Sequence, residues 1–436
     1  MPIRLAAAAL TKSRSDRGSL ISSTCRSGLA RADSVVKVAS LAARSGQLAP
    51  LSRRIQDSVA RSNPTEALKV MEIFSRRSMF DEGVALASAV ALLPHLPKCD
   101  STLLIRSVAL FAKFKVRPPV LVKALMNRVN EGGLSLTERL SLFENFVYLG
   151  IPCENLWPAV SEFSGNSVEI SSQLNRLAFS AAVAGRDGLV VEAVEKVFEI
   201  SGEISRFSEK MKILQVRAYL RYLSPKMYQS LSENSRESLR ILQADFDAEP
   251  LRKKIPCVSV EKVSECLRKL KIGFTTNLHV GPFPVDIKER DRKIIWEFSG
   301  RAKFFAGECG AAERLPVFVW QERVLHAMGY RTAVIPFWQF DRVREKKARI
   351  DIVRSTRWAV TGGQGLTSPS PKDSIVSFDA KRAADEEIER REFKGNKFPG
   401  QSGKNIGETY FVPEKMTRPW SWNRHRLDEG VGRLVL

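Results

Sequence analysis

The spacing of helical turns between residues 63 and 252 constrains this chain more than any other feature of its sequence. Apolar residues there recur at three- and four-residue steps, which is the period of an amphipathic helix. Each of the turns near Arg117, Ile151 and Arg186 joins the two helices of one pair. Successive turns lie 34 and 35 residues apart. Helical pairs of this length bury their apolar faces by stacking on neighbouring pairs. Region 63–252 therefore predicts an α-solenoid-like stack of helical repeats. The three helical pairs match one another only weakly in sequence, so a non-repetitive bundle is the alternative.

The first helix of this region carries a start signal. In "NPTEALKVMEIFSRR", Asn63 is a candidate N-cap and Pro64 occupies the first helical position. The apolar residues Ala67, Val70 and Phe74 then follow at helical spacing. We therefore expect a helix beginning at residue 64.

The charge of the chain favours a polyanionic partner. Its 436 residues include 69 Lys and Arg against 48 Asp and Glu, a net charge of +21. Residues 1–62 hold 11 basic residues against three acids, and residues 281–436 hold 29 against 21. Each phosphate that such cations neutralise releases counterions, which favours binding to nucleic acid. A merely soluble basic surface is the alternative.

Cysteine and histidine usage argues against a metal centre. The six cysteines lie far apart without a CxxC pair, and the four histidines do not cluster. Zinc sites and disulfide frameworks need closer spacings, so the pattern fits a reducing compartment. We expect no bound metal and no cofactor.

Residues 1–50 have the composition of an organellar transit peptide. They are rich in Arg, Ser and Ala and nearly free of acids. The sequence therefore predicts import into the mitochondrial matrix, with a disordered basic arm as the alternative. The chain contains no run of about 20 apolar residues, so no membrane span is expected.

After residue 258 the pattern changes to a mixture of helices and strands. Residues 258–274 indicate an amphipathic helix, and "FPVDI" and "KIIWEF" indicate a β-hairpin. A helix over 316–330, ending near Gly329, and a strand over 331–340 follow. The fold class predicted is therefore a helical-repeat region, 63–252, followed by a small α/β domain. That domain spans 258–358 with its basic C-terminal segment, and 359–436 form a flexible basic tail.

Three motifs of this module resemble a known family. "VDI", then "IIWEFSG" followed by Phe304 and Phe305, then "RVLHAMGYRTAVIPFWQF", resemble the RAP domain of organellar RNA-binding proteins. The resemblance covers residues 260–342. It implies a restriction-endonuclease-like fold, RNA as the ligand, and helical repeats and a transit peptide upstream, as the sequence indicates here.

The resemblance also raises the hypothesis of a nuclease. In the related nucleases an Asp and a Glu-x-Lys on the next strand hold Mg²⁺ and activate water. Asp286 and Glu297 match the two acids and are the candidate catalytic residues, but Ser299 stands where the lysine is wanted. Lys303 or Arg323 would have to replace that lysine. The sequence therefore favours a nuclease-like scaffold used for binding over an active enzyme.

The RNA-binding candidates are cationic and aromatic. Trp338 is the candidate for base stacking, whereas Phe337 is expected in the core. The segment after Phe340 is densely basic and indicates a helix that contacts phosphates, with a solvated helix face as the alternative. The candidates are Lys303, Arg323, Trp338, Arg342, Arg344, Lys346, Lys347 and Arg349; Arg354 and Arg357 belong to the same basic segment.

These features predict a mitochondrial RNA-binding protein acting in RNA stability, processing or translation. Its partner would be organellar messenger or ribosomal RNA. Protein docking is a second use of a helical-repeat surface. Two alternatives of another class remain. One is a structural subunit or assembly factor of the mitochondrial ribosome, which would hold ribosomal RNA and have ribosomal proteins as partners; the basic tail favours it. The other is a metal-dependent nuclease.

Overall fold

A computed structural model describes residues 34–44, 46, 48–165, 168–200, 204, 206–248, 258–306, 313–341 and 343–362, without the side chains of Ala248 and Arg301. The described chain divides into two compact units. Unit 1 runs to Phe163 and includes the segment Phe305–Pro316, and unit 2 comprises Ser164–Phe304 and the residues from Val317 onward. The division falls inside the predicted helical region, so unit 2 contains the later helices of that region together with the small sheet.

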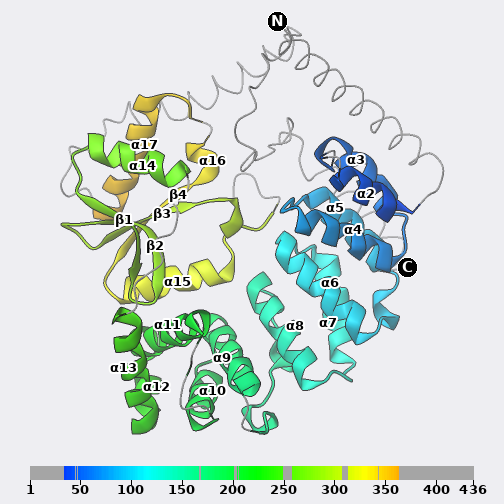
Figure 1. Cartoon of the computed structure of the whole chain (residues 1–436), viewed down its shortest axis with the longest axis horizontal. Helices are drawn as coiled ribbons and strands as arrows, with labels where there is room; N and C mark the ends of the chain where they lie inside the picture. Colours follow the sequence, from blue (N-terminus) through cyan, green and yellow to red (C-terminus); the bar gives the residue numbers. More distant parts are fainter. Residues whose placement is uncertain are drawn as a thin grey trace, which may run out of the picture. The chain divides into compact units, whose positions relative to one another are not determined.

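Unit 1 is helical, and alternate helices pack on one another. Helix α2 contacts α4, α4 contacts α6, and α6 contacts α8, while α3 contacts α5. A short 3₁₀ turn, Leu96–Lys98, packs on α7. The helices are α2 (Val35–Arg44), α3 (Leu48–Val59), α4 (Pro64–Arg76), α5 (Glu82–Leu92), α6 (Ser101–Phe114), α7 (Pro119–Asn130) and α8 (Leu136–Leu149) (Figure 1).

The helical unit begins earlier than the sequence predicts. Residues 35–44 and 48–50, assigned to the leader, lie in α2 and at the start of α3. Val35, Val38, Ala39 and Ala42 are buried because they share one face of α2 at three- and four-residue spacing. The rest of the predicted transit peptide, residues 1–33, lies outside the described residues.

The predicted start of α4 is confirmed. The Asn63 side chain accepts a hydrogen bond from the Glu66 backbone N–H, and Pro64 opens the helix. The turns predicted at Arg117 and Arg186 are also confirmed, because α6 and α7 flank the first, and α9 and α10 flank the second.

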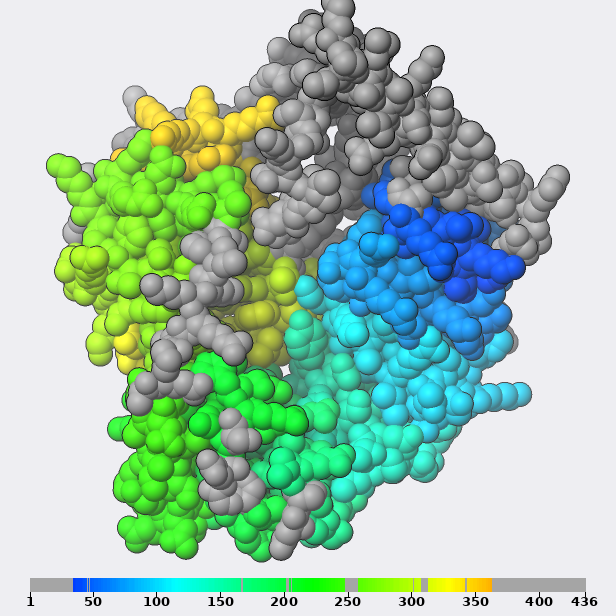
Figure 2. Space-filling view, viewed as in Figure 1, coloured from blue at the N-terminus to red at the C-terminus, as the bar shows by residue number. Residues whose placement is uncertain are grey.

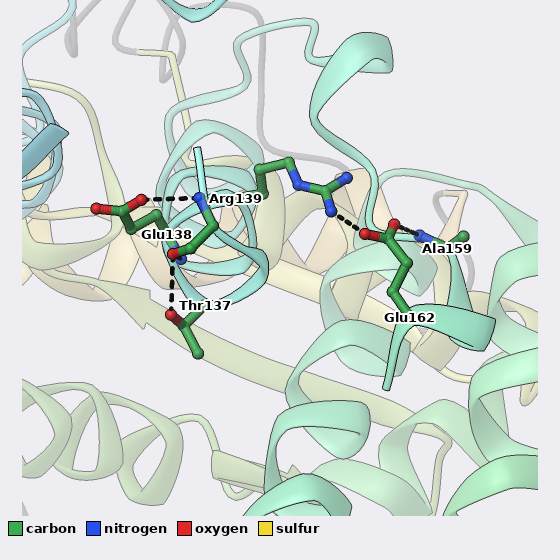
Figure 3. A network of polar contacts seen from close by, with 6 residues as sticks. Thr137, Glu138, Arg139, Ala159 and Glu162 are labelled. Carbon is green, nitrogen blue, oxygen red and sulfur yellow. Dashed lines mark hydrogen bonds and ion pairs between the residues drawn. The ribbon is translucent and has the colours of Figure 1, made fainter. Parts of the chain in front are cut away.

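The turn at Ile151 is not followed by the predicted helix. Residues 154–156 and 160–162 form only 3₁₀ turns, because Pro158 cannot donate a backbone N–H and keeps Trp157 extended. Polar contacts order this segment instead. Glu162 accepts a hydrogen bond from the Ala159 N–H and pairs with Arg139 of α8 (Figure 3).

Unit 2 begins with helices in a similar arrangement. Helix α9 contacts α11, α11 contacts α13, and α10 contacts α12. Asp187, at the start of α10, accepts hydrogen bonds from Tyr219 and Ser224. Burial, together with the hydrogen bond to Asp187, raises the pKa of Tyr219 to about 12. The helices are α9 (Val168–Val183), α10 (Asp187–Ile200), α11 (Phe207–Leu223), α12 (Pro225–Ser230) and α13 (Glu233–Ala248).

The second part of unit 2 is built on a four-stranded sheet in the order β1-β2-β3-β4. Strands β1, β2 and β3 are antiparallel neighbours, and β4 pairs with β3 in parallel. The elements are α14 (Val258–Lys269), β1 (Phe274–Val280), β2 (Phe283–Glu289), β3 (Ile294–Ser299), α15 (Pro316–Ala327), β4 (Arg331–Pro336), α16 (Phe337–Phe340) and α17 (Lys346–Thr361).

The two faces of the sheet carry different helices (Figure 1). Helices α14 and α17 cover one face, and α15 covers the other. The core between α14, α17 and the sheet includes Val263 and Leu267 of α14, Trp296 of β3 and Val353 of α17. The predicted helix, hairpin and second helix are therefore confirmed. The closing strand predicted over 331–340 ends at Pro336, and its last four residues form the short helix α16 instead. Gly329 follows α15 with a φ of +86°, which is the predicted helix-ending role.

Strand β1 was not predicted. The helix predicted over 258–274 ends at Lys269, and Phe274 begins this strand instead. Only Val280 of the strand is buried. A strand without an alternating apolar face gives little sequence signal. No helix among the described residues is long and apolar enough to cross a membrane.

Candidate nucleic-acid interface

The two acids of the nuclease hypothesis face each other on adjacent strands. Ile287 pairs with Trp296 and Lys288 with Ile295. Continuing this antiparallel register by one residue sets Asp286 opposite Glu297. The Asp286 carboxylate also accepts a hydrogen bond from the Phe298 N–H at 3.1 Å. Like charges directly opposite on neighbouring strands repel, so this pair requires a nearby cation.

Lys303 supplies that cation. Its ammonium lies 2.5 Å from the Glu297 carboxylate and 3.8 Å from that of Asp286, and the three side chains are only 12–20% exposed. It also lies 5.6 Å from the centre of the Phe318 ring of α15. The sequence raised Lys303 as a replacement for the missing lysine without a reason to prefer it. The 3₁₀ turn Arg301–Lys303, directly after β3, brings it there.

This cluster is an ion-paired scaffold as it stands. Two carboxylates are part of an Mg²⁺ ligand set, but the Lys303 ammonium already lies against both of them. The Ser299 side chain is buried, and its hydroxyl finds no hydrogen-bond partner among the described residues. Within the same residues, no group of three or more His, Cys, Asp or Glu side chains could hold a metal ion.

The basic segment after Phe340 forms α17, but not all of it is available to a ligand. Arg357 is 8% exposed and donates two hydrogen bonds to Glu289, at 2.9 and 3.0 Å. Trp296 Nε1 donates a third bond to Glu289 at 3.0 Å. Arg357 therefore anchors α17 to β2 and cannot contact a phosphate, contrary to the prediction for this segment. Arg354 pairs with Asp351 at 2.7 Å and is part-exposed.

The first turn of α17 and the segment before it form one side of a cationic pocket of about 210 Å³. Helix α14 forms the other side, and the two helices lie in contact. In Figure 2 the yellow-to-orange side chains of the α17 region reach the surface beside the green of α14. We call this the α14–α17 pocket. Its lining residues are Lys262, Glu265, Cys266, Lys269, Arg344, Lys346 and Arg349.

The pocket gathers five cations around one carboxylate. Lys346 pairs with Glu265 at 2.8 Å, and Arg349 donates to the Val343 carbonyl at 2.7 Å. The hydrogen bond with Glu265 raises the pKa of Lys346, and the neighbouring Lys346 ammonium lowers the pKa of Lys269. No ion pair within the described part of the chain involves Lys262, Lys269 or Arg344.

Two of these cations, Lys262 and Lys269, are not among the binding residues predicted from the sequence. Lys262 and Lys269 are seven residues apart and so lie on one face of α14. This seven-residue spacing is the sequence signal that would have indicated a basic face on α14. The apolar positions of α14 predict only its buried face.

The aromatic candidates pack against one another. Trp338 is half-buried and meets the rings of Phe304 and Phe337 edge to face, with centroids 4.7 and 5.1 Å away. Phe337 is also half-buried, whereas Phe304 is buried. Phe337 is therefore less buried than the core position expected for it, and part of the Trp338 ring is exposed.

The remaining candidates are scattered over unit 2. Arg323 is exposed on α15, and Lys347 is exposed on α17 outside the lining of the pocket. Arg342 lies outside the described residues. The structure thus brings together Arg344, Lys346 and Arg349 from the predicted set, and places Lys303 in the acidic pair.

No family model matches this chain, and a comparison with curated proteins finds no similar sequence.

Proposed function

We propose that this chain is a mitochondrial RNA-binding protein that holds RNA phosphates in the α14–α17 pocket. The pocket carries the proposal, because five cations share it with the single carboxylate of Glu265. Protein surfaces concentrate positive charge in this way chiefly for polyanions, and phosphate contacts supply most of the affinity for nucleic acid. The work of such a protein would be the stabilisation, processing or translation of organellar RNA.

The helical regions of the two units support the same proposal, because they would offer further surface for contact with RNA. In unit 1 each helix of the series α2, α4, α6 and α8 packs on the next, and in unit 2 α9, α11 and α13 do so. Alternate-helix contact of this kind is the packing of solenoid repeats. We therefore infer repeat-like helical surfaces that extend the contact with RNA beyond the pocket.

The resemblance to the RAP domain supports RNA as the polyanion. The motifs that carry it lie on β2, β3, α15 and β4, in the order that the resemblance implies. The mitochondrial location is supported by the composition of residues 1–33, which precede the first described helix.

Removing the unpaired cations of the pocket tests the binding proposal. We expect the triple variant Lys262→Gln, Lys269→Gln and Arg344→Gln to bind single-stranded RNA more weakly at low salt. The slope of log K against log salt should fall by about 0.7 for each lost contact, or about 2 in total. Fluorescence anisotropy of a labelled RNA, titrated between about 50 and 200 mM salt, measures both quantities.

The matched control removes three exposed cations elsewhere. Arg77→Gln, Lys98→Gln and Lys226→Gln change the net charge by the same amount at positions outside the pocket. An equal loss of affinity in both triple variants would show that the overall charge binds RNA and that the pocket does not. Failure of the unmodified protein to bind RNA at all would refute the proposal.

The metal-dependent nuclease remains an alternative hypothesis that a cleavage assay can decide. We expect RNA incubated with the protein and Mg²⁺ or Mn²⁺ to stay intact, because the Lys303 ammonium already lies against the carboxylates of Asp286 and Glu297. Gel analysis of end-labelled RNA measures this. Cleavage that requires the metal and disappears in both Asp286→Ala and Glu297→Ala would establish the nuclease instead.

A further inference from the structure

The charges of the α14–α17 pocket are unfavourable for the protein alone. The charge of Lys346 lies close enough to Lys269 to lower the pKa of Lys269, and Glu265 offsets only one positive charge. Arg344 and Lys262 line the same 210 Å³. Five cations and one acid leave an excess of four positive charges in a small volume. A bound anion would relieve this repulsion.

The start of α17 adds to the same excess. The first turn of this 16-residue helix contains Lys346 and Lys347 and no acid, and the side chain of Glu345 makes no capping hydrogen bond. A helix N-terminus carries a partial positive charge, so acids stabilise it and lysines do not. The sequence at this position is therefore the reverse of what an isolated helix favours, and an anion in the pocket would correct it.

The most buried residue of the pocket lining carries no negative charge that would repel an anion. Cys266 is 4% exposed, and burial raises the pKa of its thiol, which keeps it uncharged. The pocket is thus lined from two sides, by α14 and by residues 344–349, and its most buried residue is neutral.

We propose that the α14–α17 pocket binds the terminal phosphate of an RNA strand. This inference rests on the proposed function and specifies which phosphate the pocket takes. A phosphate inside the strand is a diester with one negative charge, whereas a terminal monoester carries nearly two at pH 7. The dianion matches an excess of four positive charges more closely. A terminal group also enters a recess with one attached sugar, whereas an internal phosphate must accommodate two.

The test compares RNAs that differ only at their ends. The full chain is titrated with one single-stranded sequence bearing a 5′-monophosphate, a 3′-monophosphate, or hydroxyls at both ends. We expect a monophosphorylated RNA to bind about tenfold more tightly than the hydroxyl form, as one added charge-assisted contact would supply. The variant Lys269→Gln with Arg344→Gln should reduce this preference to near unity, whereas Lys98→Gln with Lys226→Gln should leave it unchanged.

Each other outcome identifies what fails. Equal binding of phosphorylated and hydroxyl RNAs would overturn the terminal-phosphate inference and leave RNA binding intact. A preference that survives Lys269→Gln with Arg344→Gln would move the site away from this pocket. Adenosine monophosphate that binds as tightly as the phosphorylated RNA would make the pocket a nucleotide site and overturn the inference. Absence of binding to every RNA would instead refute the proposed function.

Discussion

Replacing Glu289 with alanine is expected to destabilise unit 2 by about 3–5 kcal/mol, because it leaves a buried arginine without its counter-ion. Glu289 is 1% exposed at the end of β2. Its carboxylate accepts two hydrogen bonds from Arg357 of α17 and one from Trp296 of β3. The substitution removes all three bonds at once, so both Arg357 and the indole N–H would lose their partner. Urea denaturation followed by circular dichroism measures the loss.

A double substitution distinguishes the energetic effect of the buried charges from the effect of the volume that their side chains fill. Breaking a buried pair on one side is costly, whereas replacing both partners by apolar residues often is not. We therefore expect Glu289→Leu with Arg357→Leu to be clearly more stable than Glu289→Ala. Glu237→Ala, which breaks an exposed pair with Arg240 on α13, should leave the transition unchanged. A Glu289→Ala protein as stable as the unmodified chain would show that the pair does not hold α17 in place.

The position of α17 matters for the proposed binding site. Arg357 lies in the fourth turn of α17, and Lys346 and Arg349 in its first turn line the α14–α17 pocket. The ion pair with Glu289 fixes the helix against the sheet, so it also fixes where those cations point. A long helix of low apolar content would otherwise depend on the few core contacts of Ile350, Val353 and Val360.

Local patterns predicted most of the elements around the site. Apolar spacing indicated α14 and α15, the dense basic segment after Phe340 indicated α17, and two short apolar runs indicated the hairpin of β2 and β3. Helix α14 and the two strands bury a continuous face of Val263, Leu267, Ile287 and Trp296, so their sequence carries a strong periodic signal. Strand β1 buries little, and the Pro158 region has apolar residues without a helix, so periodicity failed at both.

The pairings within the site could not be predicted, because they join residues distant in sequence. Glu289 and Arg357 are 68 residues apart, and neither position differs locally from an exposed charge. Lys303 was one of two cations near the acids, and only the turn after β3 selects it. The pocket needed two helices to be brought together across the sheet face. Residue types indicated the chemistry, and the fold decided which cations stay free.

Trp320 is expected to be the second position at which one substitution destabilises unit 2 by about 3–5 kcal/mol. Its indole is 4% exposed on α15. The ring lies 5.4 Å from that of Phe179 on α9, and 6.0 Å from those of Tyr219 on α11 and Phe283 on β2. Alanine would open a cavity where two helices of the helical region meet the sheet.

This cluster means that the helices α9 and α11 and the sheet share one core. Gln215 of α11 adds a buried hydrogen bond to the Pro282 carbonyl at 3.1 Å. The predicted boundary between the helical region and the α/β domain, near residues 252–258, is therefore a change of secondary structure within unit 2. Trp320→Ala should consequently loosen α9 and α11 as well as α15, although α9 lies more than 130 residues away in the sequence.

Hydrogen exchange measured by mass spectrometry can distinguish this shared core from two independent ones. In Trp320→Ala, amides of α9 and α11 should exchange faster than in the unmodified protein, together with those of α15. Trp320→Phe should show a much smaller change, because it keeps an aromatic ring and removes an indole N–H that has no partner among the described residues. Val319→Ala, at a side chain 42% exposed, should have little effect. Faster exchange confined to α15 would show that the helices and the sheet are stabilised separately, and that the change at residue 258 is a domain boundary after all.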